Sequence, residues 1–498
     1  MNIQQLLKQS LNMGQNDLRP VSGIALDSRL VQKDNVFVAV PCATVDAHIA
    51  EALQKGAALI VQEKASQNSR TQKKIASAPA EKPRFVTVDN TRLAVARLCQ
   101  AFYTPLPPKL LAVTGTNGKS SVVALAVQML AALGIKAASM GTLGVRMHGN
   151  EQNALNTPPL TTYDAVSLHK LLQTLAQNNV ACVALEATSH GLHQYRLSGL
   201  QFHAAGLTHV TQDHLDYHKT MEHYAKAKNI LFSDLVLPTG GGVLNAQSSF
   251  FALFQKTCHD KGLKVLTYGP HSDAEWQFFE ERPDHEGSQF SLRLGASFFP
   301  NLSFKLAGRF QIENLLCAMG LICSAYPDIK KEDLIATIPL LKPIPGRLEY
   351  VATHQGATIF VDFCHTPDAL EKVLTELKAR AKARVVVVFG CGGDRDATKR
   401  QPMGCIVARL ADRVIVTEDN PRTEDPALIR AEILKGAPRA ESVEGRERAI
   451  RQAVEDLHKD DILLIAGRGH ETVQHIGGRD IPFNDRDVVQ AILASFPK

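Results

Sequence analysis

Three observations predict an α/β protein of three domains. The chain has 498 residues, which corresponds to about three domains of typical size. Proline-rich segments at 103–109 and 340–349 divide it. After the first of these segments, apolar strand patterns alternate with loops and helical patterns, which favours parallel sheets covered by helices. We therefore expect domains at 1–104, 105–342 and 343–498.

The composition excludes several classes of protein. Hydrophobic residues make up 45% of the chain and charged residues 21%, as in ordinary globular proteins, which argues against wholesale disorder. The net charge of +5 is small and aromatic residues are scarce at 6%, so nucleic-acid binding is not expected. The N-terminus lacks the pattern of a signal peptide, and no apolar run is long enough for membrane insertion. The nine cysteines form no Cys-x-x-Cys pair, so we expect reduced thiols in a cytoplasmic protein.

The first domain consists of short strand and helix patterns. Buried strands are predicted at 36–40 and 58–62, with a helix near 47–55 between them and a further strand from 84 to 90. The segment 64–83 is rich in Ser, Gln, Lys and Ala, and we interpret it as a surface insertion.

The strongest local signal is a glycine-rich turn between a strand and a helix, LLAVTGTNGKSSVVALAVQMLAALG (110–134). Backbone N–H groups of such a turn, together with a helix N-terminus, form an anion cradle. Lys119 can reach the β- and γ-phosphates of a nucleotide, and the Ser120 hydroxyl can bind Mg²⁺. Gly115 and Gly118 are closer than in the usual phosphate loop, so this is a variant. The alternative is a turn that merely starts a helix, but Lys-Ser directly after the glycine favours phosphate binding.

Two later segments collect acidic and histidine side chains. Glu186 ends a predicted buried strand, where a carboxylate is costly unless it meets a cation or reaches solvent. His214 and His218 are four residues apart, which is compatible with a zinc site, with a magnesium site that uses oxygen ligands, or with a solvated polar loop. The upstream phosphate loop favours magnesium. Lys228, taken alone, is expected to face solvent.

Three apolar runs near the C-terminus each lead into a polar, Gly- or Pro-containing loop; they lie at 385–390, 414–418 and 462–467. If these strands are neighbours, Arg395, Arg422 and Glu471 converge beyond their carboxyl ends, where open α/β sheets bind ligands. Arginine grips carboxylates and glutamate accepts from ammonium groups, which suits an amino acid with more than one carboxylate. Surface salt bridging is the alternative.

Taken together, the motifs resemble those of the Mur ligases over nearly the whole chain; in order they are GTNGKSS, EATSHGL, DHLDYH, PGRLE, VDFCHTPDAL, GGDRD, DNPR and AGRGHE. The resemblance implies a small N-terminal UDP-sugar-binding α/β domain, a central parallel-sheet P-loop ATPase domain and a Rossmann-like C-terminal domain that binds an amino acid. It implies an ATP-dependent ligase of peptidoglycan precursor synthesis that works through an acyl phosphate. The arginine of DNPR resembles that of members adding meso-2,6-diaminopimelate to UDP-N-acetylmuramoyl-L-alanyl-D-glutamate.

The resemblance also implies site residues. ATP binding would fall on Gly115, Thr116, Asn117, Gly118, Lys119, Ser120, Ser121, Asn314, Arg347, Asp362 and His365. The catalytic set would be Lys119, Glu186, His214 and Lys228, and the Mg²⁺ ligands Ser120, Glu186 and Lys228, the last as a carbamate. The UDP-dipeptide would contact Leu26, Ser28, Asn156, Thr157, Pro158, Thr188, Gln194 and Arg196. Diaminopimelate would contact Arg395, Asp419, Asn420, Pro421, Arg422, Gly467 and Glu471.

Five positions depart from the family pattern: His209, Gln311, Phe363, Pro158 and Thr188.

Two other functions remain as alternatives. A ligase that adds lysine or another diamino acid is the nearest alternative, and a P-loop switch protein is an alternative of another class. Folylpolyglutamate synthases share the phosphate loop but lack the GGDRD, DNPR and GHE set. We expect a monomer whose partners are small molecules: ATP, the UDP-dipeptide and diaminopimelate.

Overall fold

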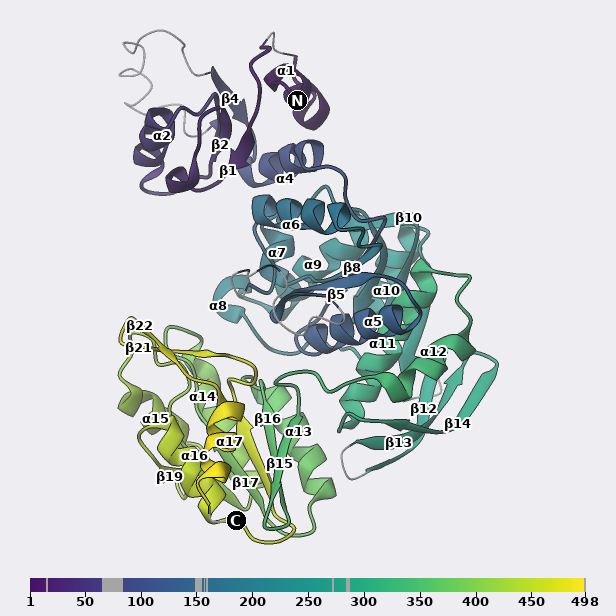
Figure 1. Ribbon diagram of the computed structural model, residues 1–498, viewed down its shortest axis with the longest axis vertical. Helices are drawn as coiled ribbons and strands as arrows, with labels where there is room; N and C mark the ends of the chain where they lie inside the picture. Colours follow the sequence, from purple (N-terminus) through teal and green to yellow (C-terminus); the bar gives the residue numbers. More distant parts are fainter. Residues whose placement is uncertain are drawn as a thin grey trace.

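A computed structural model shows a three-domain α/β fold, drawn in Figure 1 with the N-terminal domain at the top and the C-terminal domain at the bottom. It describes residues 1–14, 17–64, 84–147, 155, 157, 160–270, 273–283 and 287–496. Asn156, Pro158 and all of the predicted insertion except Lys64 lie outside the described residues. In the described part of the chain, no helix is both long and apolar enough to cross a membrane.

The N-terminal domain is a four-stranded parallel sheet in the order β1-β2-β3-β4. Its elements are α1 (Ile3–Leu11), β1 (Gly23–Ala25), η1 (Ser28–Leu30), β2 (Asn35–Ala39), α2 (Val45–Gln54), β3 (Leu59–Glu63), β4 (Arg84–Val88) and α4 (Thr91–Phe102). The strands predicted from apolar runs are confirmed. β2 is buried along its whole length, as expected for a strand covered on both faces.

The central domain contains a ten-stranded sheet in the order β14-β13-β12-β11-β10-β9-β5-β8-β6-β7. Its first half comprises β5 (Lys109–Thr114), α5 (Lys119–Ala132), β6 (Ala137–Gly141), β7 (Gly144–Met147), α6 (Ala165–Gln177), β8 (Cys182–Glu186), α7 (Ser189–His193), β9 (Phe202–Leu207), α8 (Leu215–His218) and α9 (Met221–Ile230). Its second half comprises η3 (Leu231–Leu235), β10 (Val236–Asn245), α10 (Phe251–Asp260), β11 (Lys264–Gly269), β12 (Trp276–Pro283), β13 (Ser288–Leu294), β14 (Ser297–Phe304), α11 (Arg309–Ala325), α12 (Lys331–Thr337) and η4 (Ile338–Leu340).

The prediction of a parallel central sheet is confirmed for the middle strands, but both edges of the sheet contain antiparallel strands. β7 pairs antiparallel with β6, and β13 pairs antiparallel with β12 and β14. Antiparallel neighbours can be joined by short turns, so these edges need no crossover helix. β14 alternates exposed and part-buried residues, as in a strand with one face in water. The strand-loop-helix repeat that predicted parallel pairing therefore describes only the covered part of the sheet.

The C-terminal domain is a six-stranded sheet in the order β15-β16-β20-β17-β18-β19, with a separate hairpin, β21-β22. Its elements are β15 (Glu349–His354), β16 (Ala357–Asp362), α13 (Pro367–Arg380), β17 (Val385–Phe389), η5 (Ala397–Lys399), α14 (Arg400–Leu410), β18 (Arg413–Val416), α15 (Pro426–Leu434), β19 (Glu441–Ser442), α16 (Arg446–Glu455), β20 (Ile462–Ala466), β21 (Val473–Ile476), β22 (Arg479–Pro482) and α17 (Asp485–Ala494). The three apolar runs form β17, β18 and β20, which are neighbours as the convergence argument required.

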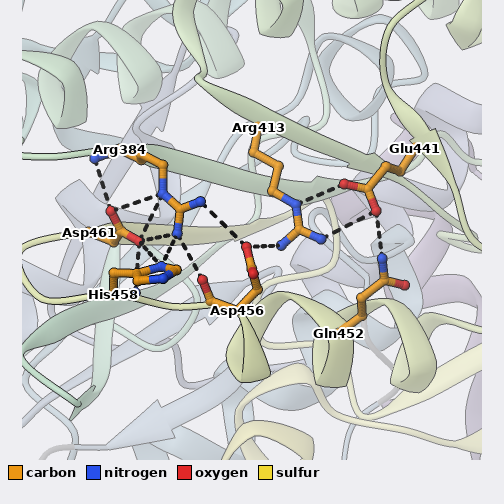
Figure 2. A network of polar contacts seen from close by, with 7 residues as sticks. All are labelled: Arg384, Arg413, Glu441, Gln452, Asp456, His458 and Asp461. Atoms are coloured by element: carbon orange, nitrogen blue, oxygen red, sulfur yellow. Dashed lines mark hydrogen bonds and ion pairs between the residues drawn. The ribbon is translucent and has the colours of Figure 1, made fainter.

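A charge network closes the amino ends of these three strands (Figure 2). Arg384 donates to Asp461 at 2.7 Å, and Arg413 donates to Glu441 at 2.8 Å. Asp456 accepts from both arginines and joins the two pairs. The network fixes the end of the sheet that is opposite to the predicted ligand loops.

Candidate functional site

The phosphate loop connects β5 to α5 as predicted. Gly115 and Gly118 have φ angles of 145° and 90°, which only glycine adopts readily. A Cβ at Gly115 would overlap Thr208, and one at Gly118 would overlap Asn314. The two glycines therefore allow the backbone to take these φ angles and allow neighbouring side chains to approach it closely.

Two lysine ammonium groups meet at the loop. The Lys119 Nζ donates to the carbonyls of Gly115 (3.0 Å) and Thr116 (2.8 Å), and the Lys228 Nζ donates to the Gly115 carbonyl (2.8 Å). Lys228 is 1% exposed, so the expectation that it faces solvent is wrong. It lies on α9 with its Nζ 4.3 Å from the centre of the Tyr224 ring. Nothing in the local sequence of α9 marks this burial, which arises from packing against the loop.

Burial lowers the pKa of both lysines. The pKa of Lys119 lies below its ordinary value because of desolvation, although Glu186 and Asp213 oppose the shift. The pKa of Lys228 lies well below its ordinary value because of desolvation and the nearby charge of Lys119. A lowered pKa raises the fraction of a lysine that is the neutral, nucleophilic amine.

Glu186 ends β8, as predicted, and is 2% exposed. Its carboxylate accepts from the Thr142 backbone N–H at 2.9 Å and from the Thr142 hydroxyl at 3.1 Å. Gly141 leaves room for it, because a Cβ there would overlap the carboxylate. These hydrogen bonds and the positive charges of Lys119 and Arg347 compensate its burial.

The C-terminal domain contributes a half-buried arginine to this region. Arg347 donates from Nη2 to the Ser120 hydroxyl at 2.9 Å, and its guanidinium lies 4.6 Å from the centre of the Phe363 ring. Burial lowers its pKa. Phe363, one of the departures from the family pattern, thus forms the stacking surface for Arg347.

Asp362 ends β16, and His365 lies on the loop that follows it, on the other side of Phe363. Asp362 accepts from the backbone N–H groups of Leu348 (2.5 Å) and Cys364 (2.6 Å), and burial raises its pKa. The His365 Nδ1 lies 2.8 Å from the Phe363 carbonyl, and burial together with Lys399 lowers its pKa to about 4. His365 is therefore neutral near pH 7.

Gln311 and His209, which also depart from the family pattern, both make hydrogen bonds near the phosphate loop. Gln311 accepts from the Asn314 amide at 3.1 Å and donates to the Arg347 carbonyl at 3.4 Å. The His209 ring lies 2.7 Å from the Glu313 carboxylate, and its carbonyl accepts from the Thr116 N–H of the phosphate loop at 2.7 Å. Both positions thus support the nucleotide side of the site.

His214 belongs to a cluster of histidine and tyrosine rings. Its ring centroid lies 4.7 Å from that of His190, which in turn lies 5.4 Å from that of His218. Desolvation lowers the pKa of His214 and His218 to about 4, so both are neutral near pH 7. The described residues contain no group of three or more histidine, cysteine or acidic side chains that could hold one metal ion.

Leu26 and Ser28 line a surface hollow of the N-terminal domain; its other lining residues are Asp27, Arg29, His48 and Glu51. The Ser28 hydroxyl donates to Glu51 at 2.6 Å, and Lys55 donates to the Ser28 carbonyl at 3.2 Å. These contacts fix the loop that presents Ser28 to the hollow.

The remaining described residues of the predicted UDP-dipeptide set lie in the central domain, and three of them meet around Thr162. The hydroxyl of Thr188 donates to that of Thr162 at 3.0 Å, and Arg196 donates to the Thr162 carbonyl at 2.7 Å. Gln194 accepts from Arg196 at 2.7 Å. Thr157 accepts from the hydroxyl of Tyr163 at 3.0 Å. The structure thus divides the predicted set between two domains.

The loops predicted to bind the amino acid lie beyond the carboxyl ends of β17, β18 and β20. Arg422 has a φ of 55° and donates from Nη1 to the Gly393 carbonyl at 2.6 Å. Asn420 donates to Glu471 at 2.7 Å, and burial and Asp419 raise the pKa of Glu471. These loops come together as predicted, while Arg395 lies exposed at the rim.

The backbone of these loops is tightly packed. A Cβ at Gly467 would overlap the Asp419 carboxylate, and one at Gly393 would overlap the Pro421 carbonyl. The buried Oδ2 of Asp419 has no hydrogen-bond partner in the described part of the chain. A buried carboxylate oxygen with spare capacity is typical of a site that completes its bonding with a ligand.

Sequence reasoning missed three supporting residues: Thr142, Asp368 and Arg468. Thr142 carries both hydrogen bonds to Glu186, and Arg468 donates to the Asn420 side chain at 3.0 Å. Asp368 accepts from Asn117 at 3.1 Å across the domain boundary. Arg468 and Asp368 stand within quoted motifs, whereas Thr142 has no local signal.

The donor chemistry around the phosphate loop fits a magnesium ion. Ser120 provides a hydroxyl and Glu186 a buried carboxylate, both hard oxygen ligands. The neutral amine of Lys228 is the form that reacts with CO₂ to give a carbamate, which would add a second anionic oxygen donor. These three residues would hold the ion.

Comparisons with known proteins agree with this geometry. The Mur ligase middle domain matches residues 113–322, and the Mur ligase glutamate ligase domain matches residues 346–469. The UDP-N-acetylmuramoyl-L-alanyl-D-glutamate–2,6-diaminopimelate ligase of Rickettsia prowazekii is 39% identical over 95% of this chain and 96% of its own. The enzyme of that name from Mesorhizobium japonicum is 42% identical over 95% of both chains.

Solved structures show the same fold. A structure of a UDP-N-acetylmuramoyl-L-alanyl-D-glutamate–2,6-diaminopimelate ligase matches 99% of both chains with a TM-score of 0.68 and 30% identity. The MurF ligase of Thermotoga maritima, solved with ADP, matches 94% of this chain and 96% of its own with a TM-score of 0.61 and 17% identity.

Proposed function

This chain belongs to the Mur ligase family of ATP-dependent amide-forming enzymes, and we propose that it adds meso-2,6-diaminopimelate to UDP-N-acetylmuramoyl-L-alanyl-D-glutamate in cytoplasmic peptidoglycan precursor synthesis. The observation that carries the proposal is the placement of Arg422, Glu471 and Asp419 on loops that follow neighbouring strands. It lies in the domain that also sends Arg347 to the phosphate loop. The relatives that bear this activity in their names cover nearly the whole chain.

The first chemical step would activate the γ-carboxylate of the D-glutamate. A carboxylate oxygen attacks the γ-phosphorus of ATP, the bond to the β-phosphate oxygen breaks, and ADP leaves. Lys119 and the backbone N–H groups of the loop would stabilise the charge of the transferring phosphoryl group. Arg347, which already bonds to Ser120, would contribute a second cation from the C-terminal domain.

Mg²⁺ would be held by Ser120, Glu186 and carbamylated Lys228, and when bound it would neutralise phosphate charge. The low pKa of Lys228 supports the carbamate, because the amine must lose its proton before it bonds to the carbon of CO₂. The carbamate then releases a second proton and becomes an anion. His214, neutral and close to this region, would face the phosphates.

The second step would form the amide. The amine of diaminopimelate attacks the acyl phosphate, phosphate leaves with its electron pair, and a proton is released. Arg422 would bind the distal carboxylate of the amino acid, and Glu471 would accept from an ammonium group. Lysine lacks that distal carboxylate and would leave Arg422 unpaired, which disfavours the lysine alternative.

The remaining assignments follow from these roles. Leu26 and Ser28 would hold the uridine end in the N-terminal hollow, and Thr157, Thr188, Gln194 and Arg196 would contact the remainder of that substrate. We propose domain boundaries near 104 and 342 and a monomeric enzyme.

A phosphate-release assay with a panel of amino acids tests the proposal. We expect release only when ATP, the UDP-dipeptide and meso-diaminopimelate are all present, with little turnover on lysine. Equal turnover on lysine would overturn the substrate assignment. Release that needs neither cosubstrate would favour a nucleotide switch.

A further inference from the structure

We propose that Asp368 is a positioning residue through which the C-terminal domain fixes the phosphate loop for phosphoryl transfer. Asp368 would not touch ATP; it would act through Asn117 and Thr211. The inference rests on the proposed function, because it names a residue that makes the same site competent.

Asp368 lies in the first turn of α13, just after Pro367. Its Oδ2 accepts from the Asn117 side chain at 3.1 Å and from the Thr211 hydroxyl at 3.2 Å. Asn117 belongs to the phosphate loop and Thr211 to the loop after β9. One carboxylate oxygen of the C-terminal domain therefore joins two loops of the central domain.

These two loops are also joined directly. The Thr116 hydroxyl donates to the Thr211 carbonyl at 3.0 Å and accepts from the Thr211 N–H at 3.0 Å. Asp368 adds a charged acceptor to this junction from the other domain. Because hydrogen bonds to a charged group are stronger than neutral ones, the domain contact should restrict the loop that carries Lys119.

The far end of α13 makes a different contact with the central domain. Arg380, the last residue of the helix, donates to the Gly287 carbonyl at 2.7 Å and to the Ser288 hydroxyl at 3.0 Å. Arg380 follows Asp368 by twelve positions, which corresponds to about 18 Å along the helix. One end of α13 thus holds the domains together at β13, and the other end contacts the nucleotide loop.

The test compares Asp368→Ala, Asn117→Ala and the double variant in full-length protein, with Glu371→Ala as a matched control. Glu371 is an acid on the same helix, and it pairs with Arg409 of α14 in its own domain. We expect Asp368→Ala to lower kcat/KM for ATP about tenfold, with KM for the amino acid unchanged. The double variant should lose less than the product of the two single losses, since the two changes remove one shared contact, and the loss beyond that of Asn117→Ala should match the smaller contribution of Thr211. Glu371→Ala should resemble the wild type.

Independent, multiplying effects of Asp368→Ala and Asn117→Ala would overturn the proposal, as would an equal loss in Glu371→Ala. Asp368→Asn keeps one acceptor oxygen and should restore part of the rate. If Asp368→Ala does not fold, Thr211→Val removes the second donor to Oδ2 and should give a smaller loss of the same kind.

Hydrogen exchange separates this inference from the proposed function. With ADP bound, amides of residues 115–121 should exchange faster in Asp368→Ala than in the wild type or Glu371→Ala. Unchanged exchange would contradict the positioning role even if the ligase assay succeeds. If the wild type shows no amino-acid-dependent turnover, the proposed function fails, whereas the exchange result still decides the role of Asp368.

Discussion

The two ends of the C-terminal sheet carry charges on the same three strands and use them differently. At the amino ends, Arg384 and Arg413 are bound by carboxylates (Figure 2). At the carboxyl ends, Arg422 donates to the Gly393 carbonyl and makes no ion pair within the described part of the chain. The buried Oδ2 of Asp419 there also has no partner among the described residues.

The difference shows how a fold separates stabilising charges from binding charges. A cation held by a carboxylate is neutralised, whereas one held by a neutral carbonyl keeps its charge for an anionic ligand. Lys119 follows the second pattern, because the carbonyls of Gly115 and Thr116 hold its ammonium group. We therefore expect substitutions of cations paired with carboxylates to reduce stability, and substitutions of cations held by neutral carbonyls to reduce activity.

Lys119→Ala should give the largest effect on activity. The variant removes the cation that would stabilise the transferring phosphoryl group, so the ligase rate should fall by about a thousandfold or more. The melting temperature should fall only modestly, because Lys119 makes no direct ion pair among the described residues and Glu186 keeps its hydrogen bonds to Thr142 and the charge of Arg347. Phosphate release and thermal unfolding, measured on the same preparation, check both expectations. A retained rate would contradict the role of the loop.

Lys228→Met should lower the rate by about a hundredfold. Methionine fills a similar buried volume and cannot form a carbamate. The wild type, equilibrated with ¹³C-bicarbonate, should show a carbamate carbon resonance that the variant lacks. A wild type without that resonance under assay conditions would remove the carbamate from the proposed site, whatever the rate of the variant.

Much of the fold could be predicted because its signals are local. The strand, glycine turn and helix at 110–134 stand in one continuous segment, and the apolar runs of β17, β18 and β20 mark buried parallel strands. The antiparallel edges at β7 and at β13-β14 were missed, because strand order depends on contacts between distant segments. Sequence spacing shows where a strand ends but not which strand lies beside it.

The site residues that follow a recognisable strand could be predicted from the sequence, whereas those placed by contacts between distant segments could not. Glu186 could be placed because it ends an apolar strand, and Arg422 because it follows one. Lys228 could not, since lysine is usually exposed and its burial depends on packing against Gly115, a contact between distant segments. The contact of Asp368 with Asn117 joins residues 251 positions apart and appears only when the domains are folded together.

Arg422→Lys tests the binding end of the C-terminal sheet. Lysine retains the charge but loses the planar pair of donors that grips a carboxylate, so KM for diaminopimelate should rise about tenfold. KM for ATP should remain the same. Arg384→Lys makes the same change at the opposite end of the sheet and should lower the melting temperature without altering KM. Steady-state kinetics and thermal unfolding of both variants check these expectations. A raised KM in Arg384→Lys together with a lowered melting temperature in Arg422→Lys would contradict the distinction between the two ends of the sheet.

Asp461→Asn gives the smallest expected effect and tests the stabilising end through its pH dependence. Burial opposes ionisation of Asp461, but hydrogen bonds from Arg384 and from backbone N–H groups hold its pKa below the ordinary value of 3.8. The stabilisation is thus fully present above pH 3.8 and is lost as the pH falls through the lower folded-state pKa. The variant should melt roughly 3 °C below the wild type near pH 7, and the difference should shrink below pH 3.8. A difference that stays constant with pH would mean that the lost stability comes from packing and not from the charge pair.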